Sequence, residues 1–287
     1  MTDVRFVKGH GTENDFVLVP DLEAALPLTP EQVVRLADRR AGIGGDGVIR
    51  IAPTESSTDD FVRQQASAAG YFMDYHNADG SVAEMCGNGV RVIATYLREQ
   101  GLETGDTFGI ATRGGVKKVR VSEDGFAVDM GPWRFSDQSA ANEFGHDTLV
   151  HVDGFPPLSA ISVDLGNPHT VVALPPDVEL AALDLSRPPV LNPVAPQGSN
   201  VEFVRPLGPG HIRMRVHERG VGETRSCGTG ACAAALATSF WATGQVEDFD
   251  EWTVEVPGGT LRVRALPGQH VELSGPAELI AEGTVRL

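Results

Sequence analysis

The sequence is poor in cysteine, in aromatic residues and in positive charge. Only three of its 287 residues are cysteines, and 6% are aromatic. A small, odd number of cysteines argues against a disulfide framework and favours free thiols in a reducing cytoplasm. Lysine and arginine number 23 against 39 acidic residues, so the net charge is −16. This acidity argues against a nucleic-acid partner and against an acidic membrane surface, since both require basic patches.

Long apolar runs and targeting segments are also missing. No run of about 18 apolar residues occurs, so we expect no membrane span. The first residues, MTDVRFV, lack the basic and apolar regions of a signal peptide, and we expect a cytoplasmic protein. The composition, 41% hydrophobic and 22% charged, is typical of a globular protein with one large domain or two of ordinary size.

Two of the three cysteines begin the same short phrase. Cys86 begins Cys-Gly-Asn-Gly, and Cys227 begins Cys-Gly-Thr-Gly about half a chain later. Further segments repeat at nearly the same offset: Gly114–Val121 and Gly258–Ala265, Val128–Pro132 and Val271–Pro276, and more loosely Asn14–Val17 and Asn167–Val171. Repeats at a near-constant offset indicate two homologous halves, with a boundary near residues 128–135.

Strands are expected to dominate both halves. Alternating apolar and polar residues predict half-buried antiparallel strands. In the first half these are Val4–Val7, Phe16–Val19, Val48–Ile51, Val116–Val121 and Phe126–Met130. In the second they are Ser162–Leu165, Thr170–Leu174, Val201–Val204, Ile212–Val216, Trp252–Val256, Leu261–Ala265 and Val271–Leu273. The fold class is therefore α/β (α+β), with mostly antiparallel sheet.

One helix is predicted directly after each cysteine phrase, over Gly87–Glu99 and Gly228–Thr243, and a glycine follows each helix as a stop signal. The second helix is small and apolar on nearly every face, so we expect a curled sheet to bury it all round. Pro30–Ala37 predicts a surface helix, whereas Gln138–Asp147 and Arg187–Gln197 are interpreted as loops.

The helix starts give the two cysteines a chemical role. The first-turn N–H groups of a helix have no intrahelical partner, and the helix dipole is positive there. Both effects favour the thiolate, so we expect the pKa of Cys86 and of Cys227 to be lowered. The same amides can hold a carboxylate. Two such ends facing one carbon would let one thiolate remove an α-proton while the opposite thiol donates another, which inverts that carbon.

The third cysteine, the histidines and the glycine-rich segment have simpler interpretations. Cys232 lies in the Ala-rich helix and is interpreted as an inert buried thiol. A metal site formed by cysteines with His10, His76, His169 or His217 lacks the usual ligand spacing, so we expect no metal. The glycine-rich segment Gly42–Gly47 lacks the nucleotide-binding spacing and is interpreted as a turn.

The polar residues near the cysteines suggest how a substrate is held. Asn77 and Glu218 each lie nine residues before a cysteine. Arg219 has the fork geometry that grips a carboxylate. Glu218 and His169 are titratable and could adjust the thiols, although a strand-end histidine with a local hydrogen bond is the simpler interpretation of His169.

Together these segments resemble one family, the diaminopimelate epimerases, over essentially the whole chain. The resemblance is carried by Lys8–Phe16, Gly42–Gly47, Asn77–Gly80, Met85–Gly89, Gly166–His169, Glu218–Gly220 and Ser226–Ala231. It implies a diaminopimelate epimerase-like fold of two pseudo-symmetric halves, each a curled, barrel-like sheet around a central helix. The N-terminal half would span residues 1–130 plus 276–287, because the last strand crosses back, and the C-terminal half residues 131–275.

The resemblance also implies a reaction. The family interconverts LL- and meso-diaminopimelate without pyridoxal phosphate or any other cofactor, in lysine and peptidoglycan precursor synthesis. Cys86 and Cys227 match its acid and base. The positions that match its carboxylate cradle are Gly87, Asn88, Gly228 and Thr229. Those that match its substrate pocket are Asn14, Asn77, Asn167, Asn200, Glu218 and Arg219. His169 and Glu218 match groups that tune the cysteines, and members are usually homodimers.

Three departures from the family pattern stand out. Thr12-Glu13 replaces the Leu-Gly of many relatives, Gly47 stands where some have a substrate-contacting Gln, and Glu272 stands where some have a Tyr at the dimer contact.

The alternatives are proline racemases and hydroxyproline epimerases of the same fold, which tend to have His where Asn88 stands. A catalytically inactive amino-acid-binding protein is a third possibility, but loss of a thiol would have indicated it, and both thiols are present.

Overall fold

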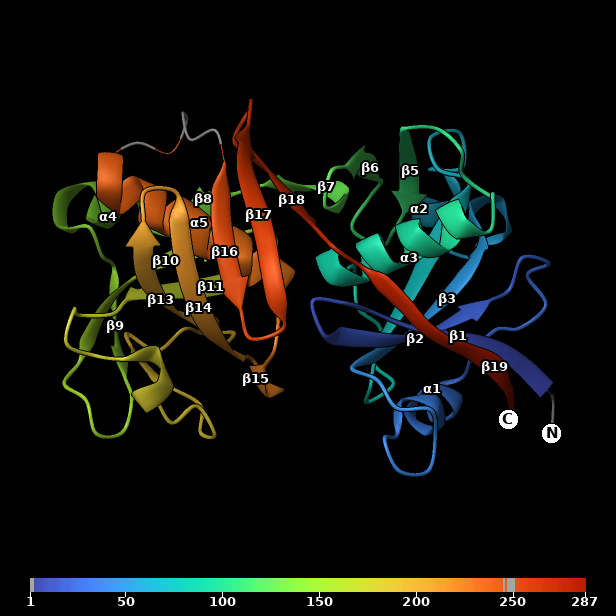
Figure 1. Ribbon diagram of the computed structural model, residues 1–287, viewed down its shortest axis with the longest axis horizontal. Helices are drawn as coiled ribbons and strands as arrows, with labels where there is room; N and C mark the ends of the chain where they lie inside the picture. Colours follow the sequence, from blue (N-terminus) through green and yellow to red (C-terminus); the bar gives the residue numbers. More distant parts are fainter. Residues whose placement is uncertain (1–2, 245, 247–250) are drawn as a thin grey trace. The chain divides into compact units, whose positions relative to one another are not determined.

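The computed structural model describes residues 3–244, 246 and 251–287. Contacts divide the chain into two units (Figure 1). The N-terminal unit comprises Met1–Asp129 and Ser274–Leu287, and the C-terminal unit comprises Met130–Leu273. These bounds differ from the predicted ones by one or two residues, and the homology of the two halves stays a prediction.

The N-terminal unit is a curled sheet around one helix. Its strands are β1 (Asp3–Gly11), β2 (Asn14–Pro20), β3 (Gly47–Pro53), β4 (Tyr71–Asn77), β5 (Thr107–Ala111), β6 (Lys117–Ser122), β7 (Gly125–Pro132) and β19 (Glu278–Arg286). Its helices are α1 (Pro30–Ala37), α2 (Asp60–Arg63), α3 (Gly87–Glu99) and the 3-10 turn η1 (Thr54–Ser56). Successive pairing gives the order β19-β1-β2-β3-β4-β5-β6-β7. Helix α3 packs against β1, β2, β6 and β19.

The C-terminal unit has the same plan. Its strands are β8 (Arg134–Phe135), β9 (Thr148–His151), β10 (Leu158–Asp164), β11 (Pro168–Ala173), β12 (Val190–Asn192), β13 (Asn200–Gly208), β14 (His211–Glu218), β15 (Gly222–Thr224), β16 (Trp252–Val256), β17 (Gly259–Leu266) and β18 (His270–Gly275). Its helices are α4 (Gln138–Phe144), α5 (Gly228–Thr243) and the 3-10 turn η2 (Leu180–Ala182). The central strands are ordered β10-β11-β13-β14-β16-β17. Helix α5 packs against all six.

The strand directions match between the two units. From β1 to β6, successive pairs are antiparallel, parallel, antiparallel, parallel and antiparallel. From β10 to β17 the sequence of directions is identical. The second parallel pair of each unit is joined through the central helix, since a parallel pair requires a crossover connection. The expectation of mostly antiparallel sheet is confirmed, with two parallel pairs in each unit.

The two central helices have the predicted bounds. Helix α5 ends at Gly244, which adopts a left-handed φ of 73° and donates its N–H to the carbonyl of Phe240. Glycine takes this conformation without the steric cost that a Cβ brings. Helix α5 is buried on nearly every face, as predicted from its apolar composition, and Cys232 within it is fully buried. Leu236, the large apolar side chain among the buried residues of α5, contributes about 1.5–3 kcal/mol to folding by its burial.

Several other predictions were incomplete or wrong. The surface helix Pro30–Ala37 is confirmed as α1, with a capping box at Thr29. The predicted loop Gln138–Asp147 is wrong, because α4 begins after the N-cap Asp137 and ends at Gly145. Within the predicted loop Arg187–Gln197, three residues form β12. The strands that were not predicted are β4, β5, β8, β9, β12 and β15, whereas β19 is the last strand that the family resemblance implied.

The segment Gly42–Gly47 is the predicted turn. Gly42 and Gly44 donate their backbone N–H groups to Asp38 and Leu36 at the end of α1. A Cβ on Gly42 would lie 1.9 Å from the carbonyl oxygen of Arg35, so only glycine fits there.

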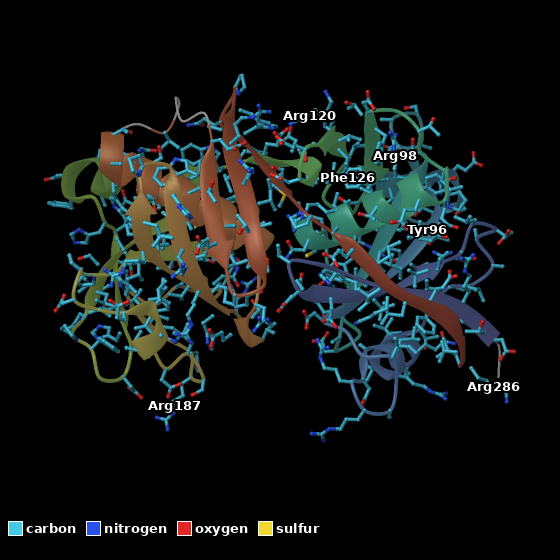
Figure 2. The ribbon with its side chains drawn as sticks, in the orientation of Figure 1. Tyr96, Arg98, Arg120, Phe126, Arg187 and Arg286 are labelled. Atoms are coloured by element: carbon cyan, nitrogen blue, oxygen red, sulfur yellow. The ribbon has the colours of Figure 1, made fainter. Side chains whose placement is uncertain are left out.

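Exposed charged side chains, such as Arg187 and Arg286, lie on the outside of their units (Figure 2). Within the described ranges, no helix combines the length and the apolar character needed to cross a membrane.

Candidate active site

Cys86 caps the start of α3. It has extended backbone angles, φ −143° and ψ 123°, and the helix begins at the next residue, Gly87. Its Sγ lies 3.6 Å from Oδ1 of Asn14, to which the thiol donates. The same oxygen accepts from Nδ2 of Asn88 at 3.1 Å. Asn14, Cys86 and Asn88, which the sequence predicted as site residues, therefore lie together at the start of this helix.

A chain of polar contacts fixes Asn14. Its Nδ2 donates to Asp46 at 2.7 Å, and Asp46 pairs with Arg39 at 2.7 Å. Asp46 lies in the turn Gly42–Gly47, so that turn holds the amide beside Cys86 rather than a nucleotide.

The hairpin turn before Asn14 explains one departure from the family pattern. Thr12 and Glu13 connect β1 to β2 with φ values of 49° and 62°. A two-residue hairpin of this kind prefers glycine, because a positive φ costs other residues about 1–2 kcal/mol each. The Thr12-Glu13 pair therefore keeps a turn that suits the Leu-Gly of many relatives, at a cost in backbone energy.

Arg91 is a buried cation that the sequence reading missed. It lies one turn into α3 and is fully buried. Its Nη2 donates to Oδ1 of Asn88 at 2.9 Å and to Oγ1 of Thr12 at 3.5 Å. Arg91 thereby orients the Asn88 amide, whose nitrogen then faces Asn14. Its only sequence signal was a charged residue inside the apolar run Val90–Ala94 of a helix expected to be central.

Asn77 is placed differently from the other predicted residues of this unit. It ends β4, and its Nδ2 donates to Oγ of Ser81 within a turn, at 3.0 Å. No described contact joins it to Cys86.

The departure from the family pattern at Gly47 has a steric reason. A Cβ on Gly47, in the adjacent strand β3, would lie 2.5 Å from Cε2 of Tyr75. This chain has no room there for the side chain that some relatives carry.

Cys227 caps α5 in the same way. It has φ −123° and ψ 116°, and its Sγ accepts the backbone N–H of Gly230 at 3.4 Å. The Thr229 hydroxyl lies 3.6 Å from the sulfur. Asn167 donates to that hydroxyl at 3.4 Å, so Asn167, Cys227 and Thr229 form a second group of predicted residues.

The predicted lowering of the Cys227 pKa is wrong. Burial raises the pKa of this thiol well above its ordinary value, and the negative charges of Glu218 and Glu202 raise it further. Hydrogen bonds from Thr229 and Gly230 act in the opposite direction but do not cancel these effects. The helix start alone would favour the thiolate, but a sulfur that is only 7% exposed loses more by desolvation.

Glu202 and His169 form a buried pair beneath this helix start. Nδ1 of His169 lies 2.7 Å from Oε1 of Glu202, and both side chains are 0% exposed. Glu202 was not predicted. Its signal was a single carboxylate within the apolar run Val201–Val204, which is uncommon unless the charge has a partner.

The remaining predicted residues lie around the ends of β13 and β14. The side chain of Asn200 accepts the backbone N–H of Arg219 at 2.9 Å and donates to the Pro168 carbonyl at 3.3 Å. The Arg219 guanidinium donates to the Gln197 carbonyl at 2.7 Å. Glu218 accepts from the Thr224 hydroxyl at 2.5 Å. Glu218 also acts on Cys227 through its charge.

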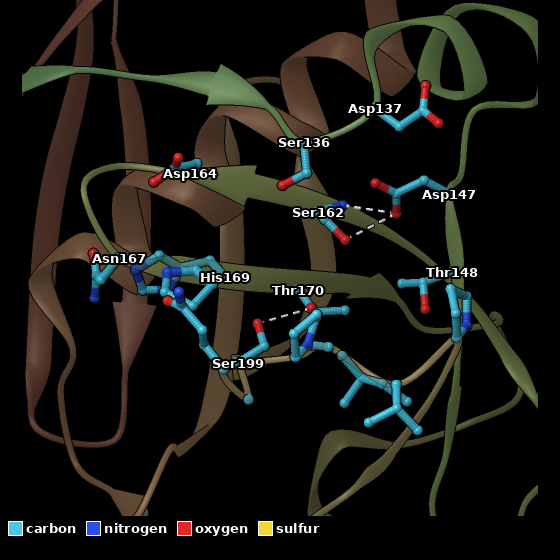
Figure 3. Close-up of a pocket in the computed structure, with 18 of the residues that line it drawn as sticks. Ser136, Asp137, Asp147, Thr148, Ser162, Asp164, Asn167, His169, Thr170 and Ser199 are labelled. Atoms are coloured by element: carbon cyan, nitrogen blue, oxygen red, sulfur yellow. Dashed lines mark hydrogen bonds between the residues drawn. The ribbon is translucent and has the colours of Figure 1, made fainter.

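A cavity of about 540 Å³ lies in the C-terminal unit beside these residues (Figure 3). Asn167 and His169 line it, with Asp147 held by Ser162 at its far side. Cys227 is not among its lining residues. Among residues 3–244, 246 and 251–287, no group of three or more His, Cys, Asp or Glu side chains is arranged to hold a metal ion.

Each helix start can thus do two things. It presents a sulfur that can exchange a proton, and it presents first-turn amides, at Gly87 and Asn88 or at Gly228 and Thr229, that can hold a carboxylate. The roles of the individual residues stay predictions.

Comparison with known proteins identifies the family. A family model described as diaminopimelate epimerase matches residues 6–136 and 161–280. Proteins named diaminopimelate epimerase from Streptomyces coelicolor and Thermobifida fusca are 49% and 48% identical to this chain. The alignments cover 98% and 99% of this chain and 95% and 98% of theirs.

Solved structures share the fold at much lower identity. A PhzF-family phenazine biosynthesis protein from Bacillus anthracis has a TM-score of 0.68 at 18% identity, with 100% of both chains covered. A hydroxyproline epimerase from Agrobacterium vitis has a TM-score of 0.64 at 15% identity, covering 99% of this chain and 92% of that one. These structures support the α/β fold class, whereas the full-length relatives establish the family. This chain is an isomerase and belongs to the diaminopimelate epimerase family.

Proposed function

We propose that this protein interconverts LL-2,6-diaminopimelate and meso-2,6-diaminopimelate through two cysteines, without a cofactor. The observation that carries the proposal is the pair of equivalent helix starts. Each unit places one cysteine at the N-cap of its central helix, within the same order of strand directions. Family membership supports diaminopimelate as the substrate.

In this proposal the two sulfurs act on opposite faces of one α-carbon. One thiolate removes the α-proton and becomes a thiol, while the other thiol gives its proton to the opposite face and becomes a thiolate. The α-carbon is inverted, and protons and charge balance. In the direction in which Cys86 is the base, Cys227 begins as the thiol, the form that its raised pKa favours. The reverse direction begins from the opposite protonation states, with Cys227 as the thiolate and Cys86 as the thiol.

The carboxylate beside the reacting carbon lies at the helix starts. An α-proton next to a carboxylate is only weakly acidic, so its removal requires N–H donors that stabilise the developing charge. The first-turn amides of α3 and α5, with the side chains of Asn88 and Thr229, supply these donors. Asn14, Asn77, Asn167, Asn200, Glu218 and Arg219 recognise the rest of the substrate, including its distal amino-acid end.

The cellular setting is part of the same proposal. The reaction belongs to lysine and peptidoglycan precursor synthesis, in the cytoplasm, and the active form is a homodimer. Glu272, at the position of a dimer-contact Tyr in some relatives, pairs with Arg264 at 2.8 Å. A charged pair there means that the dimer contact of this chain differs in chemistry from one built on Tyr.

Turnover of defined substrates tests the proposal. Purified protein is incubated with LL-diaminopimelate, and the stereoisomers are separated by chiral chromatography. We expect formation of the meso isomer up to an equilibrium mixture. L-proline and trans-4-hydroxy-L-proline serve as parallel substrates, since a similar fold occurs in a hydroxyproline epimerase. Turnover of either of these, with none of diaminopimelate, would contradict the proposal.

A further inference from the structure

We propose that Glu202 is a positioning residue for His169: its buried carboxylate accepts the Nδ1–H of the imidazole and thereby keeps Nε2 as the proton-accepting atom of the ring. The importance of this for catalysis rests on the proposed function and on the expectation, implied by the family resemblance, that His169 tunes the cysteines. The structural part, which nitrogen of His169 carries the proton, can be measured without substrate.

The sheet brings the two side chains together. Strands β11 and β13 are parallel neighbours, with His169 opposite Asn200 and Val171 opposite Glu202. Residues two apart on a strand share a face. His169 and Glu202 are therefore diagonal neighbours on one face, within reach of long side chains. Helix α5 packs against both strands.

The hydrogen bond determines the tautomer. Nδ1 of His169 and Oε1 of Glu202 are 2.7 Å apart, the length of a charge-assisted bond. An ionised carboxylate can only accept, so Nδ1 must carry the hydrogen. In the neutral imidazole the lone pair then lies on Nε2. Within the described parts of the chain, neither Nε2 of His169 nor Oε2 of Glu202 has a hydrogen-bond partner.

The carboxylate also lies against the Cys227 helix start. A Cβ on Gly230 would lie 2.7 Å from Oε1 of Glu202 and 3.2 Å from Sγ of Cys227. The same Gly230 donates its N–H to that sulfur at 3.4 Å. Glu202 thus contacts the backbone turn that holds Cys227 and bonds to His169, so it connects a residue proposed to transfer a proton with one expected to tune the cysteines.

A purely structural role predicts different behaviour. If Glu202 only fills space, Leu, which is similar in size, should replace it without changing the chemistry of His169. If Glu202 sets the tautomer, Glu202→Leu removes the acceptor and lets Nε2 take the proton. Glu202→Gln keeps an amide oxygen that can accept the same N–H, so it should restore much of the effect.

Nitrogen NMR of the protein labelled with ¹⁵N-histidine tests the tautomer directly. The His169 signals are assigned by their loss in His169→Gln. In the wild-type protein above neutral pH, we expect a protonated Nδ1 and an unprotonated Nε2. A protonated Nε2 with a bare Nδ1 would overturn the proposal, and the protonation itself is read from the wild-type protein, the variant serving only to assign the signals.

Steady-state kinetics test whether the bond from His169 to Glu202 matters for catalysis. We expect Glu202→Leu to lower kcat about 10- to 100-fold with little change in KM, the range by which loss of the hydrogen-bond partner of a metal-bound histidine lowers activity. Glu202→Gln should recover most of this loss. The matched control is Glu255→Gln, which alters another Glu–His pair of the same unit, the bond from Glu255 to His211 at 2.9 Å, and should leave kcat unchanged.

The outcomes separate the two proposals. A wild-type tautomer and a wild-type kcat in Glu202→Leu would overturn the positioning role. A wild-type protein that does not convert diaminopimelate would contradict the proposed function, while the tautomer of His169 would still decide the structural inference.

Discussion

The two helix starts share a backbone arrangement but not their electrostatic surroundings. Cys86 and Cys227 are both N-caps with extended angles, and each is followed by Gly-x-Gly. Five residues further on, the helices differ: α3 has the buried Arg91, whereas α5 has the buried Cys232. In α3 the cation is Arg91, which is hydrogen-bonded to Asn88. Next to the start of α5 lies instead a carboxylate, Glu202, which is hydrogen-bonded to His169.

This difference shows how the same arrangement of strands and helix, present in both units, can hold two thiols in different electrostatic surroundings. The shared strand order fixes where each sulfur lies, because the helix enters between equivalent strands. The side chains around each sulfur then set its behaviour. Burial and two nearby carboxylates favour a protonated Cys227. Two-base chemistry requires one acid and one base at the start of each turnover, and unequal surroundings supply that inequality.

Removing either sulfur should have the largest effect. We expect Cys86→Ala and Cys227→Ala each to lower epimerisation by about 100- to 10,000-fold, the range that general acid–base catalysis contributes. The measurement is meso-diaminopimelate formed per unit time. Cys232→Ala is the matched control, since it removes a buried thiol from α5 and should retain near-normal turnover. Near-normal turnover in either of the first two variants would break the equivalence of the two helix starts.

The glycines three residues after each cysteine, Gly89 and Gly230, should respond unequally to substitution. Gly230→Ala places a methyl group against Glu202 and Cys227, so we expect kcat to fall about 10- to 100-fold through misplacement of the sulfur. At the equivalent Gly89, a Cβ would meet Cε of Met73 at 2.7 Å and Cδ1 of Ile49 at 2.9 Å. Those ends of flexible apolar side chains can shift, so Gly89→Ala should change kcat far less. Equal losses in the two variants would contradict the difference described here.

The residues five positions after each cysteine, Arg91 and Cys232, should affect stability more than chemistry. Arg91→Met removes buried hydrogen bonds to Asn88 and Thr12, and we expect it to destabilise the fold by about 3 kcal/mol. Cys232→Ala deletes one buried sulfur and should cost about 1 kcal/mol. Urea unfolding of both variants measures these costs. An Arg91→Met variant as stable as the wild type would show that the buried cation is dispensable.

Thiol alkylation should show the smallest but most specific difference. In a Cys86→Ala/Cys232→Ala background only Cys227 can react, and only its thiolate reacts quickly. The raised pKa keeps Cys227 protonated, so its rate with iodoacetamide should increase mainly above about pH 9. Glu218→Gln removes one negative charge and should move this increase to lower pH. Half-maximal reactivity of the parent variant below about pH 8 would contradict the raised pKa.

Sequence patterns predicted the central elements because those elements depend on local signals. The bounds of α3 and α5 follow from glycine after each helix and from cysteine at each start. Helix α4 was missed because its sequence is polar and lacks periodicity, although Asp137 as N-cap and Gly145 as C-cap marked both ends. Strand β19 pairs with β1, at the opposite end of the chain, and no local pattern specifies such a partner.

The sequence indicated which residues lie near each cysteine, but it did not indicate how deeply these residues are buried or which charges surround them. Cys86, Asn14 and Asn88 lie together as expected, as do Cys227, Thr229 and Asn167. Arg91 and Glu202 were missed because their importance comes from burial, which the fold alone determines. The direction of the Cys227 pKa was wrong for the same reason, since desolvation outweighs the local effect of the helix start.

One measurement tests the central claim, two thiols acting on opposite faces of one carbon, most directly. LL-diaminopimelate is converted in D₂O, and both the remaining substrate and the product are analysed by mass spectrometry at low conversion. The account predicts one deuterium in each meso product molecule and none in the recovered LL substrate, because the removing sulfur and the donating sulfur are different. Deuterium entering the LL substrate as fast as it enters the product, or a product without deuterium, would contradict it.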